Sequence, residues 1–317
     1  MADYTNQYTN QSDHSQFNDS QRSLNQPKLL DQYHLFAGGW SKLLTQLQAH
    51  LESGQTTKFI FTPNPEQIVQ AEHNPKFKRD LQQADWLLPD GGGVTTALKL
   101  GWGTRQKSNL TRIAGADLAE QLVCFQFDPK KSCRNTLNQK PGSKPGLKSD
   151  LKERISENST LKTKQLKMLV VGGRNYSRSP QVISSSEHPS GALLLKTKDF
   201  QVFWTPAYDQ ASQPTSQEEK ELAAIINRLK PDVVFVALGA PLQERWSISH
   251  RELLQNSQVK LTMVVGGAFD FILGKVKRAP SWLRKLGLEW LFRLIGQPWR
   301  WKRQLRLIEY LWLLARN

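Results

Sequence analysis

The sequence has few cysteines and no long hydrophobic run, and both absences narrow the classes of protein that it can represent. Only two of its 317 residues are cysteines, Cys124 and Cys133. Their spacing fits no zinc motif and no disulfide framework, so we interpret both as incidental thiols from a reducing compartment. No uncharged stretch approaches the ~20 residues that span a bilayer, and the polar N-terminus lacks a signal-peptide pattern. We therefore expect a cytoplasmic protein that is at most peripheral to a membrane.

Familiar motifs for metals and nucleotides are missing as well. The 6 histidines are scattered, without an H-x-x-x-H pair, so we expect no metal site. No G-x-G-x-x-G follows the first predicted strand, and no G-x-x-x-x-G-K-[ST] occurs. These absences argue against standard dinucleotide binding and against P-loop chemistry, and we expect no bound cofactor.

Acidic residues are scarce relative to basic ones. The chain has 43 Lys and Arg against 28 Asp and Glu, a formal charge of +15. Between Gly274 and Asn317 there are eleven basic and two acidic residues, so this segment supplies +9 of the total. Such a balance indicates an anionic partner, which the charge alone leaves open as nucleic acid, a phosphorylated substrate or an anionic membrane surface.

The patterns that are present divide the chain into four parts. Residues 1–27 are rich in Asn, Gln and Ser and predict a disordered polar tail. Residues 28–273 alternate predicted strands and helices, interrupted at 126–165 by a Lys-, Pro-, Gly- and Ser-rich stretch typical of a flexible basic insertion. Residues 274–317 form a basic, Trp-rich helical appendage.

The predicted strands indicate the fold class. Runs such as "DVVFVAL" and "LTMVVGG" are apolar almost throughout, as in strands of a parallel sheet that is buried on both faces. Their alternation with amphipathic helices predicts an α/β protein, a Rossmann-like and largely parallel sheet flanked by helices.

Polar residues and glycines follow the predicted strands. The strand ends read "TPNPE", "PDGGG", "VVGGR", "LGAPLQE" and "VGGAFD". Ligands of such sheets bind at the carboxyl ends of the strands, so we expect these loops to converge on one site. Taken singly, each has a plainer explanation: Asp90 or Asp270 as a helix cap, Asn64 as part of a Pro-Asn-Pro turn, Gln243 at a helix start, and Arg112 as an ion-pair partner.

Five motifs in order carry a resemblance to a known family. They are "TPNPEQIVQA", "ADWLLPDGGGV", "RIAGADLAEQL", "PDVVFVALGAPLQERW" and "VVGGAFDFILGKVKRAPSWLRKLGLEWLFRL". Together they resemble the WecG/TagA/CpsF bacterial glycosyltransferases from about Lys58 to Arg303. The resemblance implies transfer, with inversion, of an N-acetylmannosamine-type sugar from a UDP-sugar. The implied acceptor is a sugar on a polyprenyl diphosphate at the cytoplasmic membrane face, in cell-surface polysaccharide synthesis, without a metal.

The resemblance also implies roles for particular residues. Asp90 matches the general base that takes the proton of the acceptor hydroxyl, and the glycines after it would give clearance for a sugar. Thr62 and Asn64 match residues that position the sugars, and Arg112 matches an arginine near the leaving diphosphate. The matches on the nucleotide side and in the basic segment are Gln243, Gly266, Gly267 and Asp270, then Arg293, Arg300 and Arg303.

The last predicted helix has an apolar face flanked by cations. Trp301, Leu305, Ile308 and Trp312 fall on one side of it. This pattern is typical of a helix on an anionic bilayer, and the resemblance implies a membrane-binding segment that completes the active site. A core helix, a helix that binds a partner (a homo-oligomer included) and a nucleic-acid surface fit the same pattern.

Two other functions fit the sequence less well. A basic nucleic-acid-binding protein would explain the charge but not the polar and glycine-rich strand ends. A catalytically degenerate membrane scaffold would not need Asp90, Asn64 and Gln243. We therefore expect an enzyme with no nucleic-acid partner.

Overall fold

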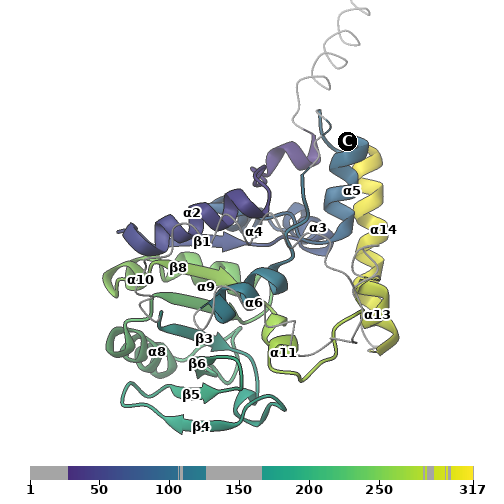
Figure 1. The fold of residues 1–317 in the computed structure, drawn as a ribbon. Coiled ribbons are helices and arrows are strands. Elements are labelled where there is room, and N and C mark those ends of the chain that lie inside the picture. Colours follow the sequence, from purple (N-terminus) through teal and green to yellow (C-terminus); the bar gives the residue numbers. More distant parts are fainter. Residues whose placement is uncertain are drawn as a thin grey trace, which may run out of the picture.

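The computed structural model describes residues 28–105, 107, 110–125, 166–280, 283, 289–296, 298 and 301–316. The predicted tail (1–27) and the predicted insertion (126–165) lie outside these residues. One eight-stranded sheet runs through the described part, with helices on both of its faces (Figure 1). The predicted α/β class with a largely parallel sheet is confirmed.

The sheet has the strand order β2-β1-β8-β7-β3-β6-β5-β4. Six of its strands are parallel: β1 (Lys58–Phe61), β2 (Trp86–Leu87), β3 (Met168–Gly172), β6 (Gln201–Thr205), β7 (Val233–Ala237) and β8 (Leu261–Val264). A hairpin, β4 (Ser184–Glu187) and β5 (Leu193–Lys196), adds two antiparallel strands at one edge. The central strands are buried on both faces, as their apolar runs predict, whereas every residue of β4 is exposed.

Helices cover both faces because successive side chains of a strand point to opposite sides. In β7, Val234 and Val236 join one core cluster, and Val233 and Phe235 join the other. The first face is covered by α3 (Pro65–His73), α4 (Pro75–Gln82), α5 (Gly92–Leu100), α8 (Ser216–Leu229), α9 (Leu242–Ser249), α10 (Arg251–Asn256) and α14 (Trp301–Arg316). The second face is covered by α2 (Trp40–Ser53), α6 (Gly115–Phe125) and α11 (Ala268–Ile272).

The described part of the C-terminal segment includes the helices α13 (Glu289–Gly296) and α14, with Pro298 between them. Proline disrupts a helix interior, so Pro298 accounts for the break between them. Helix α14 packs beside α3, and its Tyr310 and Leu314 are 0% and 5% exposed in the core (Figure 1). One side of α14 therefore packs into the core. The predicted domain boundary at residue 274 stays a prediction. No helix in the described ranges combines the length and the hydrophobicity needed to cross a bilayer.

One expectation about the cysteines is wrong. Cys124, at the end of α6, is disulfide-bonded. It is therefore not an incidental thiol, and the low cysteine content alone could not show this. The other cysteine of the chain, Cys133, lies outside the described residues.

Candidate active site

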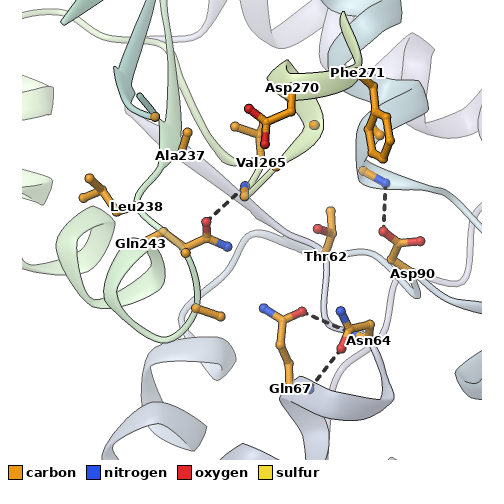
Figure 2. Close-up of a pocket in the computed structure, with 18 of the residues that line it drawn as sticks. Thr62, Asn64, Gln67, Asp90, Ala237, Leu238, Gln243, Val265, Asp270 and Phe271 are labelled. Atoms are coloured by element: carbon orange, nitrogen blue, oxygen red, sulfur yellow. Dashed lines mark hydrogen bonds between the residues drawn. The ribbon is translucent and has the colours of Figure 1, made fainter. Parts of the chain in front are cut away.

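A cavity of about 1030 Å³ opens at the carboxyl edge of the parallel strands. The loops that follow β1, β2, β3, β7 and β8 form its wall, which is the convergence expected for this fold (Figure 2). Eight of the residues expected from the sequence line it: Thr62, Asn64, Asp90, Gln243, Gly266, Gly267, Asp270 and Arg293.

The turn after β1 forms one wall and starts α3. Asn64 Oδ1 accepts a hydrogen bond from the Gln67 backbone N–H at 3.0 Å, and Gln67 Oε1 accepts one from the Asn64 N–H at 3.1 Å. Asn64 is therefore the N-cap of α3 and also a lining residue of the cavity. The cap uses the amide oxygen, which leaves the NH₂ group as the part of Asn64 that can donate to a ligand.

Asp90 lies where the chain leaves β2 and faces the same cavity. Its Oδ1 accepts the Gly91 N–H at 2.6 Å, and its Oδ2 accepts the Gly115 N–H, at the start of α6, at 3.2 Å. Arg112 Nη2 lies 3.4 Å from Oδ1. These contacts hold the carboxylate in one orientation while its side chain stays 25% exposed.

The surroundings of Asp90 act on its pKa in opposite directions. Burial raises this pKa above the ordinary value, while Arg112 and the two backbone N–H groups lower it. The balance is a raised pKa, which makes the carboxylate a stronger base than an aspartate in water.

The glycines after Asp90 give clearance to a neighbouring turn. A Cβ on Gly93 would lie 2.8 Å from Pro65 Cγ, and one on Gly91 would lie 3.1 Å from Pro65 Cδ. Gly91 also has a φ of +84°, which side-chain-bearing residues rarely adopt. The interpretation of these two glycines as clearance for a sugar is therefore wrong, because Pro65 occupies the space.

Gly115, the first residue of α6, lies against the turn after β1. A Cβ at this position would lie 2.8 Å from Thr62 Oγ1 and 3.1 Å from Thr62 Cγ2. The same residue donates its N–H to Asp90. The absence of a side chain at Gly115 thus lets Thr62 and Asp90 sit side by side at the cavity.

We expect Gly115→Ala to disturb both of these side chains. The crowding should cost about 1–3 kcal/mol of unfolding free energy. The displacement of Thr62 and Asp90 should lower turnover about tenfold or more. Gly296→Ala is the matched control, because no atom lies within 4 Å of a Cβ there. Denaturant unfolding and turnover of both variants test this, and equal behaviour of the two would contradict it.

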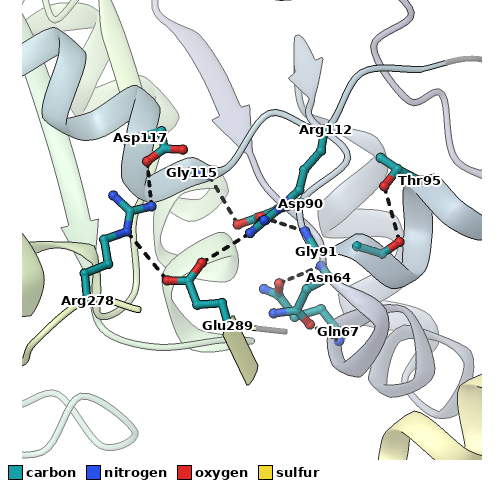
Figure 3. A network of polar contacts seen from close by, with 11 residues as sticks. Asn64, Gln67, Asp90, Gly91, Thr95, Arg112, Gly115, Asp117, Arg278 and Glu289 are labelled. Carbon is teal, nitrogen blue, oxygen red and sulfur yellow. Dashed lines mark hydrogen bonds and ion pairs between the residues drawn. The ribbon is translucent and has the colours of Figure 1, made fainter. Parts of the chain in front are cut away.

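Arg112 is part of a chain of ion pairs that leads away from Asp90 (Figure 3). Glu289 of α13 lies 3.4 Å from Arg112 Nη2 and 3.6 Å from Arg278 Nε. Arg278 also pairs with Asp117 of α6 at 2.6 Å. The structure thus places Arg112 beside the carboxylate, in a network that joins the C-terminal segment to the loop bearing Asp90. Arg112 is thus also the ion-pair partner that its plainer explanation predicts, with Asp90 and Glu289 as the carboxylates.

The opposite wall is formed by the turns after β7 and β8. Gln243, near the start of α9, accepts the Gly266 N–H on Oε1 at 3.0 Å (Figure 2). Asp270 of α11 stands near the phenol of Tyr176, whose pKa is raised by burial and by this carboxylate. A Cβ on Gly267 would lie 3.2 Å from Asp270 Oδ2. The wall therefore offers amide, carboxylate and backbone groups for recognising a polar ligand.

Several cations surround the cavity. Arg293 lines it and lies over the Phe271 ring at 4.2 Å. Arg306 lines it too and pairs with Glu66 at 3.2 Å. The side chain of Arg303 and the whole of Arg300 lie outside the described residues.

Some lining residues were not among those expected from the sequence. Arg174 and Tyr176 follow β3, and Lys275 follows α11. Arg174 comes directly after the "VVGG" strand end, so the strand-end pattern could have found it. Lys275 and Glu289 follow no such pattern, and only the fold brings them here. Across the described residues, no group of three or more His, Cys, Asp or Glu is placed to hold a metal ion.

The geometry of the cavity defines a class of site. An oriented carboxylate with a raised pKa faces a cavity, and arginines and a lysine stand around the same space. Such a site can accept a proton from one group while cations stabilise negative charge on another. This combination suits transfer of a group from an anionic donor to a hydroxyl.

Comparison with known proteins identifies the family. Residues 31–175 and 195–317 match the model of the "Glycosyl transferase WecG/TagA/CpsF family". The chain belongs to this family, as its motifs indicate, and it is a glycosyltransferase.

Two similar proteins are known from Bacillus. The chain is 30% identical over 272 residues to the N-acetylglucosaminyldiphosphoundecaprenol N-acetyl-beta-D-mannosaminyltransferase of Bacillus subtilis (strain 168), covering 85% of this chain and 84% of that protein. It is also 30% identical over 271 residues to the protein of the same name from Bacillus spizizenii (strain ATCC 23059 / NRRL B-14472 / W23), covering 84% of each chain.

Proposed function

We propose that the protein transfers an N-acetylmannosamine-type sugar from a UDP-sugar to a sugar carried on a polyprenyl diphosphate, with inversion at C1. The names of the two relatives support this donor sugar and an N-acetylglucosamine-bearing lipid diphosphate as acceptor. The observation that carries the proposal is the position of Asp90, an oriented carboxylate of raised pKa on the wall of the cavity.

In the proposed reaction Asp90 is the general base. The acceptor hydroxyl attacks C1 of the donor sugar from the face opposite to UDP, and its proton passes to the Asp90 carboxylate. The bond between C1 and the phosphate oxygen breaks, and its electron pair leaves with UDP. Thr62 and Asn64 lie beside Asp90 on the wall and suit the positioning of the sugars.

The leaving UDP gains negative charge, which cations can stabilise. Arg293 and Arg306 line the cavity, and Arg174 and Lys275 add two further cations that the sequence did not single out. Arg112, Arg300 and Arg303 stay proposals for the same task. Gln243, Gly266, Gly267 and Asp270 form the wall proposed for the nucleoside.

The exposed side of α14 is proposed as the surface that meets the inner face of the plasma membrane. Trp301, Leu305, Ile308 and Trp312 are 54%, 52%, 66% and 55% exposed, while Tyr310 of the same helix is buried. Large apolar side chains that stay exposed beside cations suit an anionic bilayer. Arg306 of this helix lines the cavity, so the surface and the site share an element.

A UDP-release assay tests the function. We expect UDP release from UDP-N-acetylmannosamine when a short-chain polyprenyl diphosphate N-acetylglucosamine is present. Without that acceptor, the rate of release should be lower by about tenfold or more. A panel of other UDP-sugars and the acceptor lacking its sugar are the controls. Release that is independent of the acceptor, or transfer from none of the UDP-sugars, would contradict the proposal.

A further inference from the structure

Glu244 is a buried carboxylate that stands behind the cavity wall. It belongs to α9, next to Gln243, and is 0% exposed. Burial raises the pKa of Glu244 to about 7, and the negative charge of the nearby Asp80, in α4, raises the same pKa further. Asp80 Oδ2 lies 4.0 Å from Arg245 Nε. A fully buried carboxylate is costly unless hydrogen-bond donors use its lone pairs. Its place behind the wall therefore depends on the bonds that it accepts.

The hydrogen bonds of Glu244 connect the two walls of the site. One oxygen, Oε1, accepts from Gln67 Nε2 at 3.0 Å and from Gln243 Nε2 at 2.9 Å. The oxygens of these two amides accept the backbone N–H groups of Asn64, at 3.1 Å, and of Gly266, at 3.0 Å. The chain of bonds thus runs from the turn after β1 to the turn after β8 through a single carboxylate oxygen.

The backbone N–H groups at the two ends of this series of hydrogen bonds fix the direction of every bond in it. A backbone N–H can only donate, so the amide oxygens of Gln67 and Gln243 must face Asn64 and Gly266. The two NH₂ groups then point inward, and both need an acceptor. An oxygen with two lone pairs can serve both, whereas an apolar side chain would leave two buried donors without a partner.

We propose that Glu244 is a positioning residue, which holds the Asn64 turn and the Gly266 turn in their relative places by fixing the amide orientation of Gln67 and Gln243. Both amides line the cavity, but Glu244 does not touch it. One side chain thereby couples the wall that bears the sugar-positioning residues to the wall proposed for the nucleoside. The inference rests on the proposed function for the meaning of the two walls.

Two substitutions separate the acceptor oxygen from the charge. Glu244→Gln keeps an oxygen that can accept both bonds, and we expect its turnover and KM to stay within about threefold of wild type. Glu244→Met keeps the size but has no such acceptor. We expect it to raise the UDP dissociation constant and to lower kcat, each about tenfold or more. The reason is that the amides of Gln67 and Gln243 lose the acceptor that orients them, so the turns that they hold can move.

A control of equal instability excludes a purely structural effect. Ile226→Ala removes a fully buried side chain of α8, away from the cavity, and should lower the melting temperature without a change in UDP affinity. Hydrogen exchange gives a readout that does not need activity: the amides of Asn64 and Gly266 should exchange faster in Glu244→Met than in Ile226→Ala.

Three results would overturn the inference. The first is wild-type UDP binding and turnover by Glu244→Met. The second is a folded Glu244→Gln that is as impaired as Glu244→Met. The third is an Ile226→Ala variant with the same losses as Glu244→Met at the same melting temperature. If wild type itself neither binds UDP nor releases it, the proposed function fails instead. The exchange of the two amides still tests the positioning in that case.

Discussion

Replacement of Asp90 by Asn is expected to lower transfer by about 10²–10⁴-fold, which is the usual contribution of a general base. The amide has nearly the shape of the carboxylate and can still accept a backbone N–H, but it cannot take a proton from the acceptor hydroxyl. UDP should still bind with a dissociation constant within about threefold of wild type, because the nucleoside wall is untouched. Steady-state transfer and calorimetric binding of UDP measure the two quantities.

Asp85→Asn is the matched control. Asp85 precedes β2 and Asp90 follows it, so the two carboxylates lie beyond opposite ends of this strand. Asp85 accepts the Phe59 N–H and pairs with Lys58, away from the cavity. Its variant should keep the wild-type turnover. Wild-type turnover by Asp90→Asn, or an equal loss in both variants, would show that Asp90 is not the base.

The pH profile offers a second test of the same role. A base must be ionised, so transfer should fall as the pH drops through the pKa of Asp90. Burial raises this pKa, and the acid limb of kcat/KM should therefore lie above the ordinary aspartate value of about 3.8. Arg112→Ala removes the nearest cation and should shift that limb to higher pH. A shift to lower pH would contradict the ion pair between Arg112 and Asp90.

Binding to anionic vesicles is expected to depend on the exposed side of α14. Ile308→Glu combined with Trp312→Glu should lower the partition coefficient about 100-fold or more, since each apolar side chain contributes about 1.5–3 kcal/mol on leaving water. The added carboxylates also repel the anionic surface. Sedimentation with vesicles that contain anionic lipid measures the bound fraction.

Ile183→Glu provides a matched control for Ile308→Glu. Both isoleucines are exposed, 72% for Ile183 and 66% for Ile308, and the substitution is the same. Ile183 precedes β4, at the edge of the sheet far from α14 (Figure 1). Its variant should bind vesicles as wild type does. If both single variants bind equally well, α14 is not the membrane surface.

The strand ends were predictable from the sequence for a simple reason. Carboxyl ends of parallel strands share one edge of a sheet, so "TPNPE", "PDGGG" and "VGGAFD" had to meet once the strands were recognised. The same pattern holds for Arg174, which directly follows the "VVGG" strand end. The helical period also grouped Trp301, Leu305, Ile308 and Trp312 on one side of α14, and the structure leaves these four exposed.

Other features had no local signal. An apolar helix face looks the same whether it meets a core or a bilayer, and only the packing of Tyr310 and Leu314 shows which side of α14 is covered. The glycines after Asp90 read as space for a ligand, but Pro65 fills that space. The disulfide bond of Cys124 likewise could not be read from the number of cysteines.

By itself, then, the sequence determined the fold class, the edge of the sheet where the site lies and several of the side chains on its wall, because these follow from local periodicity and from strand direction. Tertiary structure alone decided which partners those side chains have. Glu289 reaches Arg112, and Glu244 joins Gln67 to Gln243, across long stretches of chain. Such pairings depend on how helices from distant segments pack on the sheet, and no spacing along the chain encodes them.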